Sequence, residues 1–427
     1  MIKRIIVVLT LIVLVLKSVP AIGAVSASPA EPVIAGAAAL VLDAENGQVL
    51  YGKSQDRKMY PASTTKIVTA LVALEMSSPD DMVEVSRQAA EVAGSRVGLQ
   101  PGERLPMEHL LYMLMLNSAN DAAVAIAEHV GGSVQGFAEL MNRRAGQLGA
   151  RHTNFTNPHG LPDANHYSTA RDLAVIGRGA MQNDTFQDIA GTTTIKLGRK
   201  EYMSPEVLRR VEKLEQIHGP LQEDFYNHNR LLTQSYNGYK GANGIKTGYT
   251  AEAGQCIVAS ARRDGREMIA VVLNSRGASL WADAAALLDY GFDGFTPVEL
   301  VTPRQMITDT AVKNGADRAT LETAEYFYYN FPLGRSPEVT RQVELPDNIV
   351  APLEAGQKVG ELVLESQGRE LGRVPLANIS PVPRSLTSYP WWPLLGVPVF
   401  LLLLYGMIRR RRNRRSRPLY LKQGYRR

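Results

Sequence analysis

The distribution of hydrophobic and polar positions predicts two pairs of strands that lie far apart in the chain. In AALVLDAENGQVLYGK, two apolar runs flank Asn46-Gly47, a dipeptide typical of a hairpin turn. The same arrangement returns in GQCIVASARRDGREMIAVVLN, where Asp264-Gly265 stands at the turn. We therefore expect one antiparallel hairpin near the start of the folded chain and another some two hundred residues later.

Between these pairs the pattern is mostly helical. Residues 61–190 carry apolar positions at helical spacing, with loops predicted at Gly94-Ser95 and over 154–168. A further helix is predicted over 281–290. Strands at both ends with helices between them predict an α+β domain with a single sheet built from both ends of the domain.

The pattern changes after about residue 296. Segments such as RQVEL and GELVLE alternate apolar and polar residues with turns between them, which predicts a small β-rich domain ending near Pro383. The predicted organisation is a signal peptide over 1–27, a linker over 28–36, a first domain over 37–295, the β-rich domain over 296–383, a transmembrane helix over 388–408 and a basic cytoplasmic tail over 409–427.

Both ends of the chain carry targeting signals. Lys3 and Arg4 precede a long apolar run and small residues, which indicates a cleavable secretory signal, with an uncleaved anchor as the alternative. Near the other end, eighteen uncharged residues precede a run of arginines. This length just suffices for a membrane span, and the arginines mark the cytoplasmic side. Two prolines in this region keep an interfacial helix as the alternative.

Charge and cysteine content exclude several classes of protein. The formal net charge is +5, but the last nineteen residues hold ten Arg and Lys and no acid. The folded body is therefore net acidic, and the basic pI does not indicate binding to nucleic acid. Cys256 is the only cysteine, which excludes an internal disulfide framework. The seven histidines show no metal-ligand spacing.

The stretch PASTTKIVTALVALE starts a helix that is apolar almost all round, yet it holds Ser63 and Lys66. Residues at i and i+3 share a helix face, and a helix N-terminus favours an oxyanion. A lysine among apolar neighbours loses its proton more readily and could act as a neutral base for the serine. The alternative is a helix-capping serine beside a surface lysine.

Two further short motifs could contribute to the same chemistry. Ser118-Ala119-Asn120 lies between two predicted helices, where its hydroxyl could relay a proton and its amide could hold a substrate carbonyl. N-capping is the alternative. Lys246-Thr247-Gly248 leads into the second strand pair, where a cation beside a hydroxyl could bind a carboxylate and a glycine would allow close approach of the substrate.

The order S-x-x-K, S-x-N, K-T-G is that of penicillin-interacting serine enzymes. With FTNPHGLPDANHYSTARDLA, NHNRLL and KTGYTAEAGQCIVAS, the chain resembles D-alanyl-D-alanine carboxypeptidases, the low-molecular-mass penicillin-binding proteins, over about residues 35–383. The resemblance implies a penicillin-binding, β-lactamase-like fold followed by a small β-domain. His159 and His166, in the 154–168 loop, are expected to make loop hydrogen bonds.

The resemblance also implies roles for the motif residues. Ser63 would be the acylated nucleophile, Lys66 its base, and Ser118 and Asn120 would assist proton transfer and position the peptide. Lys246 and Thr247 would bind the terminal carboxylate, Gly248 would admit the substrate, and the backbone N–H groups of Ser63 and Tyr249 would form the oxyanion hole. No metal or cofactor is implied.

The expected reaction removes the terminal D-alanine of peptidoglycan stem pentapeptides, and β-lactams would acylate the same serine. The body would lie outside the cytoplasm, held to the cell membrane by the C-terminal helix, without a nucleic-acid partner. Two alternatives stay open. A β-lactamase shares the three motifs but needs a deacylating glutamate loop, which the sequence does not show. A non-catalytic penicillin sensor or wall-binding scaffold would keep the fold without the reaction.

Overall fold

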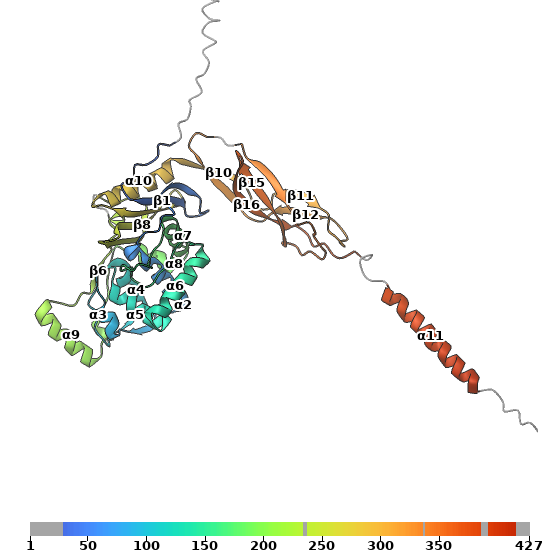
Figure 1. The fold of residues 1–427 in the computed structure, drawn as a ribbon, viewed down its shortest axis with the longest axis horizontal. Helices are drawn as coiled ribbons and strands as arrows, with labels where there is room; N and C mark the ends of the chain where they lie inside the picture. The colour runs from blue at the N-terminus through green and yellow to red at the C-terminus, as the bar shows by residue number, and fades with distance from the viewer. Residues whose placement is uncertain (1–28, 234–236, 336–337, 386–391, 416–427) are drawn as a thin grey trace, which may run out of the picture. The chain divides into compact units, whose positions relative to one another are not determined.

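The protein is described by a computed structural model that covers residues 29–233, 237–335, 338–385 and 392–415. The predicted signal peptide over 1–27 lies outside these residues, as does the end of the basic tail. The chain divides into two compact units (Figure 1). Unit 1 comprises Met1–Val298 with Tyr329–Ser336, and unit 2 comprises Glu299–Tyr328 with Pro337–Arg427.

Unit 1 is built on one antiparallel five-stranded sheet in the order β2-β1-β9-β8-β7. Both predicted hairpins are present, and the turn residues Gly47, Asp264 and Gly265 have positive φ, as such tight turns require. The prediction of one sheet built from both ends of the domain is confirmed. The strands are β1 (Ala38–Asp43), β2 (Val49–Lys53), β7 (Ala242–Thr250), β8 (Gly254–Arg263) and β9 (Arg266–Ser275).

The sheet is covered on both faces, which explains why its central strands are apolar without a break. In β1, Leu40 and Leu42 pack into the larger core cluster, whereas Ala39 and Val41 pack into a second cluster with helix α10 (Ser279–Asp293). Side chains alternate between the faces of a strand, so a strand buried on both sides needs apolar residues at every position. Figure 1 shows α10 on one side of the sheet and the other helices on the opposite side.

The larger core cluster joins the sheet to a helical layer. The helix predicted over 281–290 is α10, which begins two residues earlier and ends three later. The remaining helices of this unit are η1 (Ala62–Thr65), α2 (Lys66–Met76), α3 (Arg87–Glu91), α4 (Met107–Leu116), α5 (Asn120–Gly131), α6 (Val134–Leu148), α7 (Ala170–Ala180), α8 (Asp184–Gly191), η2 (Lys200–Tyr202), α9 (Pro205–His218) and η3 (Arg230–Leu232).

An excursion between two short paired strands was not predicted. β5 (Thr194–Lys196) and β6 (Asp224–Tyr226) pair, and the chain between them forms η2 and α9. The start of α9 carries ordinary sequence signals, because Ser204 caps the Val207 N–H and Pro205 occupies the first turn. A second short pair, β3 (Met82–Glu84) with β4 (Arg104–Pro106), brackets the chain around the predicted 94–95 loop.

The residues predicted as a linker are partly packed. Ile34 is buried, and the backbone N–H groups of Ala35 and Gly36 donate to the two carboxylate oxygens of Asp283 on α10, each at 2.9 Å. The Lys53 ammonium donates to the carbonyls of Ile34 and Gly36. This short segment is therefore attached to unit 1 immediately before β1 begins.

The second unit is β-rich, as predicted. Its main sheet is five-stranded, with the order β11-β12-β16-β15-β14 and its own apolar core. The strands of this sheet are β11 (Met306–Thr310), β12 (Ala319–Thr323), β14 (Thr340–Glu344), β15 (Lys358–Ser366) and β16 (Arg369–Asn378). Two further strands, β10 (Phe295–Val301) and β13 (Phe327–Pro332), form a two-stranded sheet, and the division between the units falls within each of them.

The last element is helix α11 (Trp392–Arg415). Its described apolar side chains are exposed, among them Phe400 and Leu402. Among the described residues, no helix meets the length and apolarity needed to cross a bilayer. Residues 388–391 of the predicted transmembrane span over 388–408 lie outside the described residues, and the span is not confirmed.

Candidate active site

The two residues of the S-x-x-K motif lie in contact at the start of the first helical segment. Ser63 lies in the 3₁₀ turn η1, and Lys66 is the first residue of α2, so the α-helix begins five residues after Pro61, where the sequence predicted a helix start. A 3₁₀ helix has three residues per turn, so the side chains at i and i+3, here Ser63 and Lys66, lie directly above one another. The Lys66 Nζ atom is 3.1 Å from the Ser63 Oγ atom.

Lys66 is fully buried, but its amine is surrounded by polar atoms and not only by apolar neighbours as predicted. Its Nζ donates to the Asn120 side-chain oxygen at 2.7 Å and to the His159 carbonyl at 2.9 Å. Burial, followed by repulsion from Lys246, holds the pKa of Lys66 well below its usual range, and the Asp121 carboxylate opposes the shift.

The S-x-N motif spans the turn between α4 and α5 and the first residue of α5. Ser118 has a positive φ of 59°, an unusual conformation for a serine that directs the chain from α4 into α5. Its hydroxyl oxygen is buried without a hydrogen-bond partner in the described part of the chain, and the residue lines the same cleft as Ser63. Asn120 begins α5 and holds Lys66.

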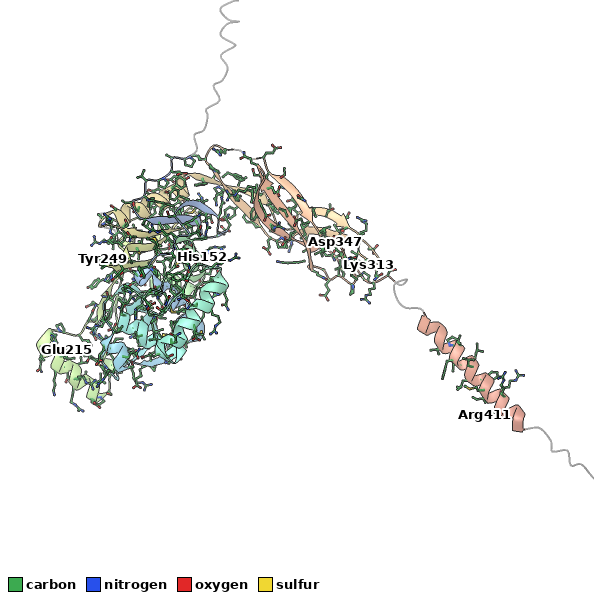
Figure 2. All side chains as sticks on the ribbon, viewed as in Figure 1. His152, Glu215, Tyr249, Lys313, Asp347 and Arg411 are labelled. Atoms are coloured by element: carbon green, nitrogen blue, oxygen red, sulfur yellow. The ribbon has the colours of Figure 1, made fainter. Side chains whose placement is uncertain are left out.

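The K-T-G motif lies on the edge strand β7, directly against η1. Lys246 is buried and donates to the Thr247 carbonyl at 3.1 Å, and burial lowers its pKa to about 7. A Cβ on Gly248 would be 2.8 Å from the Ser63 backbone nitrogen, so only glycine fits between the strand and the turn. Tyr249 is 68% exposed and lies at the margin of the unit (Figure 2).

These elements enclose a cleft of about 590 Å³. It is lined by Ser63, Ser95, Ser118, Asn227, His228, Arg230, Thr247, Gly248, Tyr249, Gln255, Gly277, Ala278, Leu280 and Trp281. None of the lining residues that the structure describes is acidic, and Arg230 contributes a cationic side chain. The cleft is therefore suited to an anionic ligand.

Sequence reasoning missed several lining residues. Arg230 belongs to the NHNRLL segment, which carried the family resemblance but no expected role, and its guanidinium lies 6.0 Å from the ring centroid of Trp281. Ser95 lies in a predicted loop, but nothing in the sequence places that loop at the cleft. Each is brought there by long-range packing, which no local pattern reports.

The 154–168 loop forms hydrogen bonds with the segment that carries Ser63 and Lys66. His166 takes part in them, as the expectation of loop hydrogen bonds for the histidines predicted. The Thr156 N–H donates to His166 Nδ1 at 3.0 Å, so the other ring nitrogen carries the proton and donates to the Thr65 hydroxyl at 2.9 Å. The Thr69 hydroxyl donates to the Pro158 carbonyl at 2.7 Å. The loop therefore anchors both η1 and α2.

The arrangement has a definite chemical capability. A neutral amine has two N–H donors and one lone pair. If Asn120 and His159 accept the two hydrogens of Lys66, the lone pair faces the Ser63 hydroxyl and can accept its proton. Serine nucleophiles are activated by an adjacent base in this way.

Comparison with known proteins agrees with this geometry. A family model described as D-alanyl-D-alanine carboxypeptidase, Peptidase S11, matches residues 25–277. A second, described as the C-terminal domain of penicillin-binding protein 5, matches residues 295–384.

Individual relatives cover most of the chain. The D-alanyl-D-alanine carboxypeptidase DacF of Bacillus subtilis is 32% identical over 347 residues, which is 79% of this chain and 84% of the relative. Penicillin binding protein 5 from Haemophilus influenzae superimposes with a TM-score of 0.69 at 27% identity, covering 83% of this chain and 99% of that one. The D-alanyl-D-alanine carboxypeptidase DacD from Francisella tularensis superimposes with a TM-score of 0.63 at 27% sequence identity, and the match covers 84% of this chain and 96% of that one.

Fold and site thus define a penicillin-binding serine hydrolase, with an α+β body and a C-terminal β-rich domain. Within that class, the chain belongs to the D-alanyl-D-alanine carboxypeptidase family of serine peptidases.

Gly248→Ala will test the close approach of β7 to η1. The added methyl would lie 2.8 Å from the Ser63 nitrogen and 3.0 Å from that of Thr64, so the strand or the turn must move. We expect acylation by a fluorescent penicillin to slow by at least about tenfold, because small displacements of catalytic groups are costly. Gly146→Ala, on the exposed face of α6 where no atom lies within 4 Å of the added methyl, is the control for loss of a glycine elsewhere in unit 1. Unchanged acylation in Gly248→Ala would contradict the steric argument.

The buried histidines predict sensitivity to acid. Burial lowers the pKa of His166 to about 4, from 6.5 in the unfolded chain, so the unfolded state binds the extra proton between these values. The free energy of unfolding should therefore fall by about 3 kcal/mol from pH 6.5 to pH 4 through this residue alone. His166→Gln should flatten that slope in denaturant titrations, whereas His152→Gln, at an exposed histidine, should not. Parallel slopes in wild type and His166→Gln would contradict the assignment.

Proposed function

We propose that the protein is a serine-type carboxypeptidase that removes the terminal D-alanine of peptidoglycan stem pentapeptides through an acyl-enzyme on Ser63. The observation that carries this assignment is the 3.1 Å contact between Ser63 Oγ and the buried Lys66 amine. The other two acceptors of that amine orient its lone pair toward the hydroxyl.

In the acylation step, Ser63 Oγ attacks the carbonyl carbon of the penultimate residue while its proton passes to Lys66. The oxyanion that forms is held by the backbone N–H groups of Ser63 and Tyr249. When the tetrahedral intermediate collapses, the C–N bond breaks and the leaving amine of D-alanine takes a proton, relayed from Lys66 through the Ser118 hydroxyl. The buried, unpartnered oxygen of Ser118 supports a relay at this position.

The residues proposed to orient the substrate lie on β7 and at the start of α5. Lys246 and Thr247 bind the terminal carboxylate, Asn120 positions the peptide, and Gly248 lets the extended substrate lie along β7. A carboxylate beside Lys246 favours its ammonium form, which burial disfavours in the free enzyme. Water then hydrolyses the Ser63 ester, and the proton transfers run in reverse.

β-Lactams acylate Ser63 by the same attack, because the strained ring amide replaces the peptide bond. A β-lactamase would hydrolyse this ester rapidly. Among the described residues that line the cleft no carboxylate is present to activate a water molecule, which favours a long-lived adduct and the peptidase assignment. A scaffold without catalysis would not need the aligned amine.

Incubation of the full-length protein in detergent with diacetyl-Lys-D-Ala-D-Ala will test the assignment. We expect release of D-alanine by wild type and none by Ser63→Ala. Lys66→Met should lower the rate by roughly 10³-fold, because proton abstraction loses its base. Lys53→Met, which removes a lysine on β2, is the control and should retain activity. Absence of D-alanine release by folded wild type would refute the proposed reaction.

We also propose that the enzyme body lies outside the cytoplasm and is attached to the cell membrane through α11. The exposed side chains from Val397 to Ile408 are mostly large and apolar, and Arg409 begins a basic run. Apolar residues next to arginines are typical of a helix that meets a membrane, either across it or along its surface.

Truncation after Ser385 will test this attachment. The shortened chain should move from the membrane fraction to the soluble fraction and keep its penicillin binding, since it retains the whole of unit 1. Extraction of the full chain with alkaline carbonate distinguishes the two modes, because a spanning helix resists it and a surface helix does not. Persistent membrane association of the truncated, signal-processed protein would contradict a role for α11.

A further inference from the structure

A fully buried ion pair, Arg199 with Glu103, is separate from the proposed catalytic residues. Arg199 lies near the start of the segment between β5 and β6 that contains α9, which we call the α9 excursion. The Arg199 Nε atom is 2.9 Å from one oxygen of Glu103, and its Nη2 is 3.0 Å from the other. Neither side chain is exposed to solvent. Such a bidentate pair is specific in geometry, and removing one partner leaves an uncompensated buried charge.

The other guanidinium donors bind backbone carbonyls of the chain between β3 and β4. Arg199 donates to the carbonyls of Val97 at 3.1 Å and Gly98 at 3.3 Å, and also to that of Gln222 at 3.3 Å. One side chain thus joins both ends of the excursion to a segment of an earlier loop. We call residues 93–103 the cleft loop, because its Ser95 lines the catalytic cleft.

The cleft loop is in turn bonded to the first residues of α5. The Asp121 carboxylate accepts from the N–H groups of Val97 at 3.1 Å and Leu99 at 3.0 Å. The Ser95 carbonyl accepts from the Asn120 N–H at 2.7 Å. Because Arg199 holds the carbonyls and Asp121 the N–H groups of the same segment, the loop is fixed from both sides.

One contact of the cleft loop decides which way the Asn120 amide faces. The Asn120 Nδ2 atom donates to the Ala93 carbonyl at 2.7 Å. With the amide held in this orientation, the Asn120 Oδ1 atom faces the Lys66 amine and accepts from it, also at 2.7 Å. If the loop moved away, the amide would be free to rotate and would present N–H groups to an amine that needs an acceptor. The lone pair of Lys66 would then no longer be held toward Ser63.

We propose that Arg199, paired with Glu103, is a positioning residue for the peptidase reaction: it fixes the cleft loop so that Asn120 presents its carbonyl oxygen to Lys66. The pair acts through Asn120 and touches neither the substrate nor Ser63. Figure 1 shows the α9 excursion, on which Figure 2 labels Glu215, at the end of unit 1 away from α10, so the pair connects the site to a peripheral element. This inference rests on the proposed roles of Lys66 and Asn120.

The test is a double-mutant cycle on the full-length protein, read by the rate of acylation with a fluorescent penicillin. Arg199→Met should slow acylation by at least about tenfold and change the non-covalent binding constant less than threefold. The acylation rate of Arg199→Lys should lie between those of wild type and Arg199→Met, since lysine keeps the positive charge but cannot form the bidentate contact with Glu103. In an Asn120→Ala background, Arg199→Met should change the rate less than threefold, because the two residues act in one chain of contacts.

Leu287→Ala controls for loss of stability alone. Leu287 is buried on α10, in the cluster on the other face of the sheet, so its truncation should lower the melting temperature without slowing acylation. If Arg199→Met does not fold, Arg199→Lys and Glu103→Gln are read in the same cycle. Wild-type acylation in a folded Arg199 variant, or effects of Arg199 and Asn120 that multiply independently, would overturn the proposal.

Failure of the proposed peptidase function would be seen separately. Acylation by penicillin reports on Ser63 and Lys66 whether or not the protein releases D-alanine. A wild type that binds penicillin but does not release D-alanine would refute the reaction and leave the positioning role intact. Independent effects in the cycle would refute the positioning role and leave the reaction intact.

Discussion

The site depends on how one amine is hydrated and bonded. Lys66 is removed from water, lies near a second buried lysine and is left with acceptors for only two hydrogens besides the serine. Charged amines are strongly stabilised by water, so burial supplies the free energy that favours the neutral form. The same burial requires that the polar atoms around the amine be fixed, because an unsatisfied donor in the interior is costly.

That requirement explains why three segments distant in sequence converge on one short turn. The 154–168 loop supplies a carbonyl to Lys66 and a histidine to Thr65, α5 supplies Asn120, and β7 packs its glycine against Ser63. Even Gly160 is required, since a side chain there would meet the Ala62 carbonyl. The turn η1 is thus held by its surroundings and not by its own helical propensity.

Much of this could be predicted from the sequence, because the predicted features are local. The hairpin turns are two-residue signals, and the strands of a sheet covered on both faces are continuous apolar runs. The S-x-x-K contact follows from helical spacing. The Arg199–Glu103 pair could not be found in this way, since its partners are 96 positions apart and either residue alone reads as a surface charge. The start of α2 was misplaced because a 3₁₀ turn and an α-helix share the same apolar pattern.

The buried lysines of the cleft and the buried arginine outside it have different surroundings, which fit their different proposed roles. In the part of the chain that the structure describes, no carboxylate lies in hydrogen-bond contact with Lys66 or Lys246, and burial lowers the pKa values of both lysines. Arg199, in contrast, is buried against a carboxylate that satisfies its guanidinium. Placing an acid against Lys66 would restore its ammonium form and remove the proposed base. In the proposed mechanism the catalytic amine therefore has to be held by neutral oxygens, and the ionic bond that stabilises the surrounding loop has to lie outside the cleft. The separation of Glu103 from the cleft lining satisfies both conditions at once.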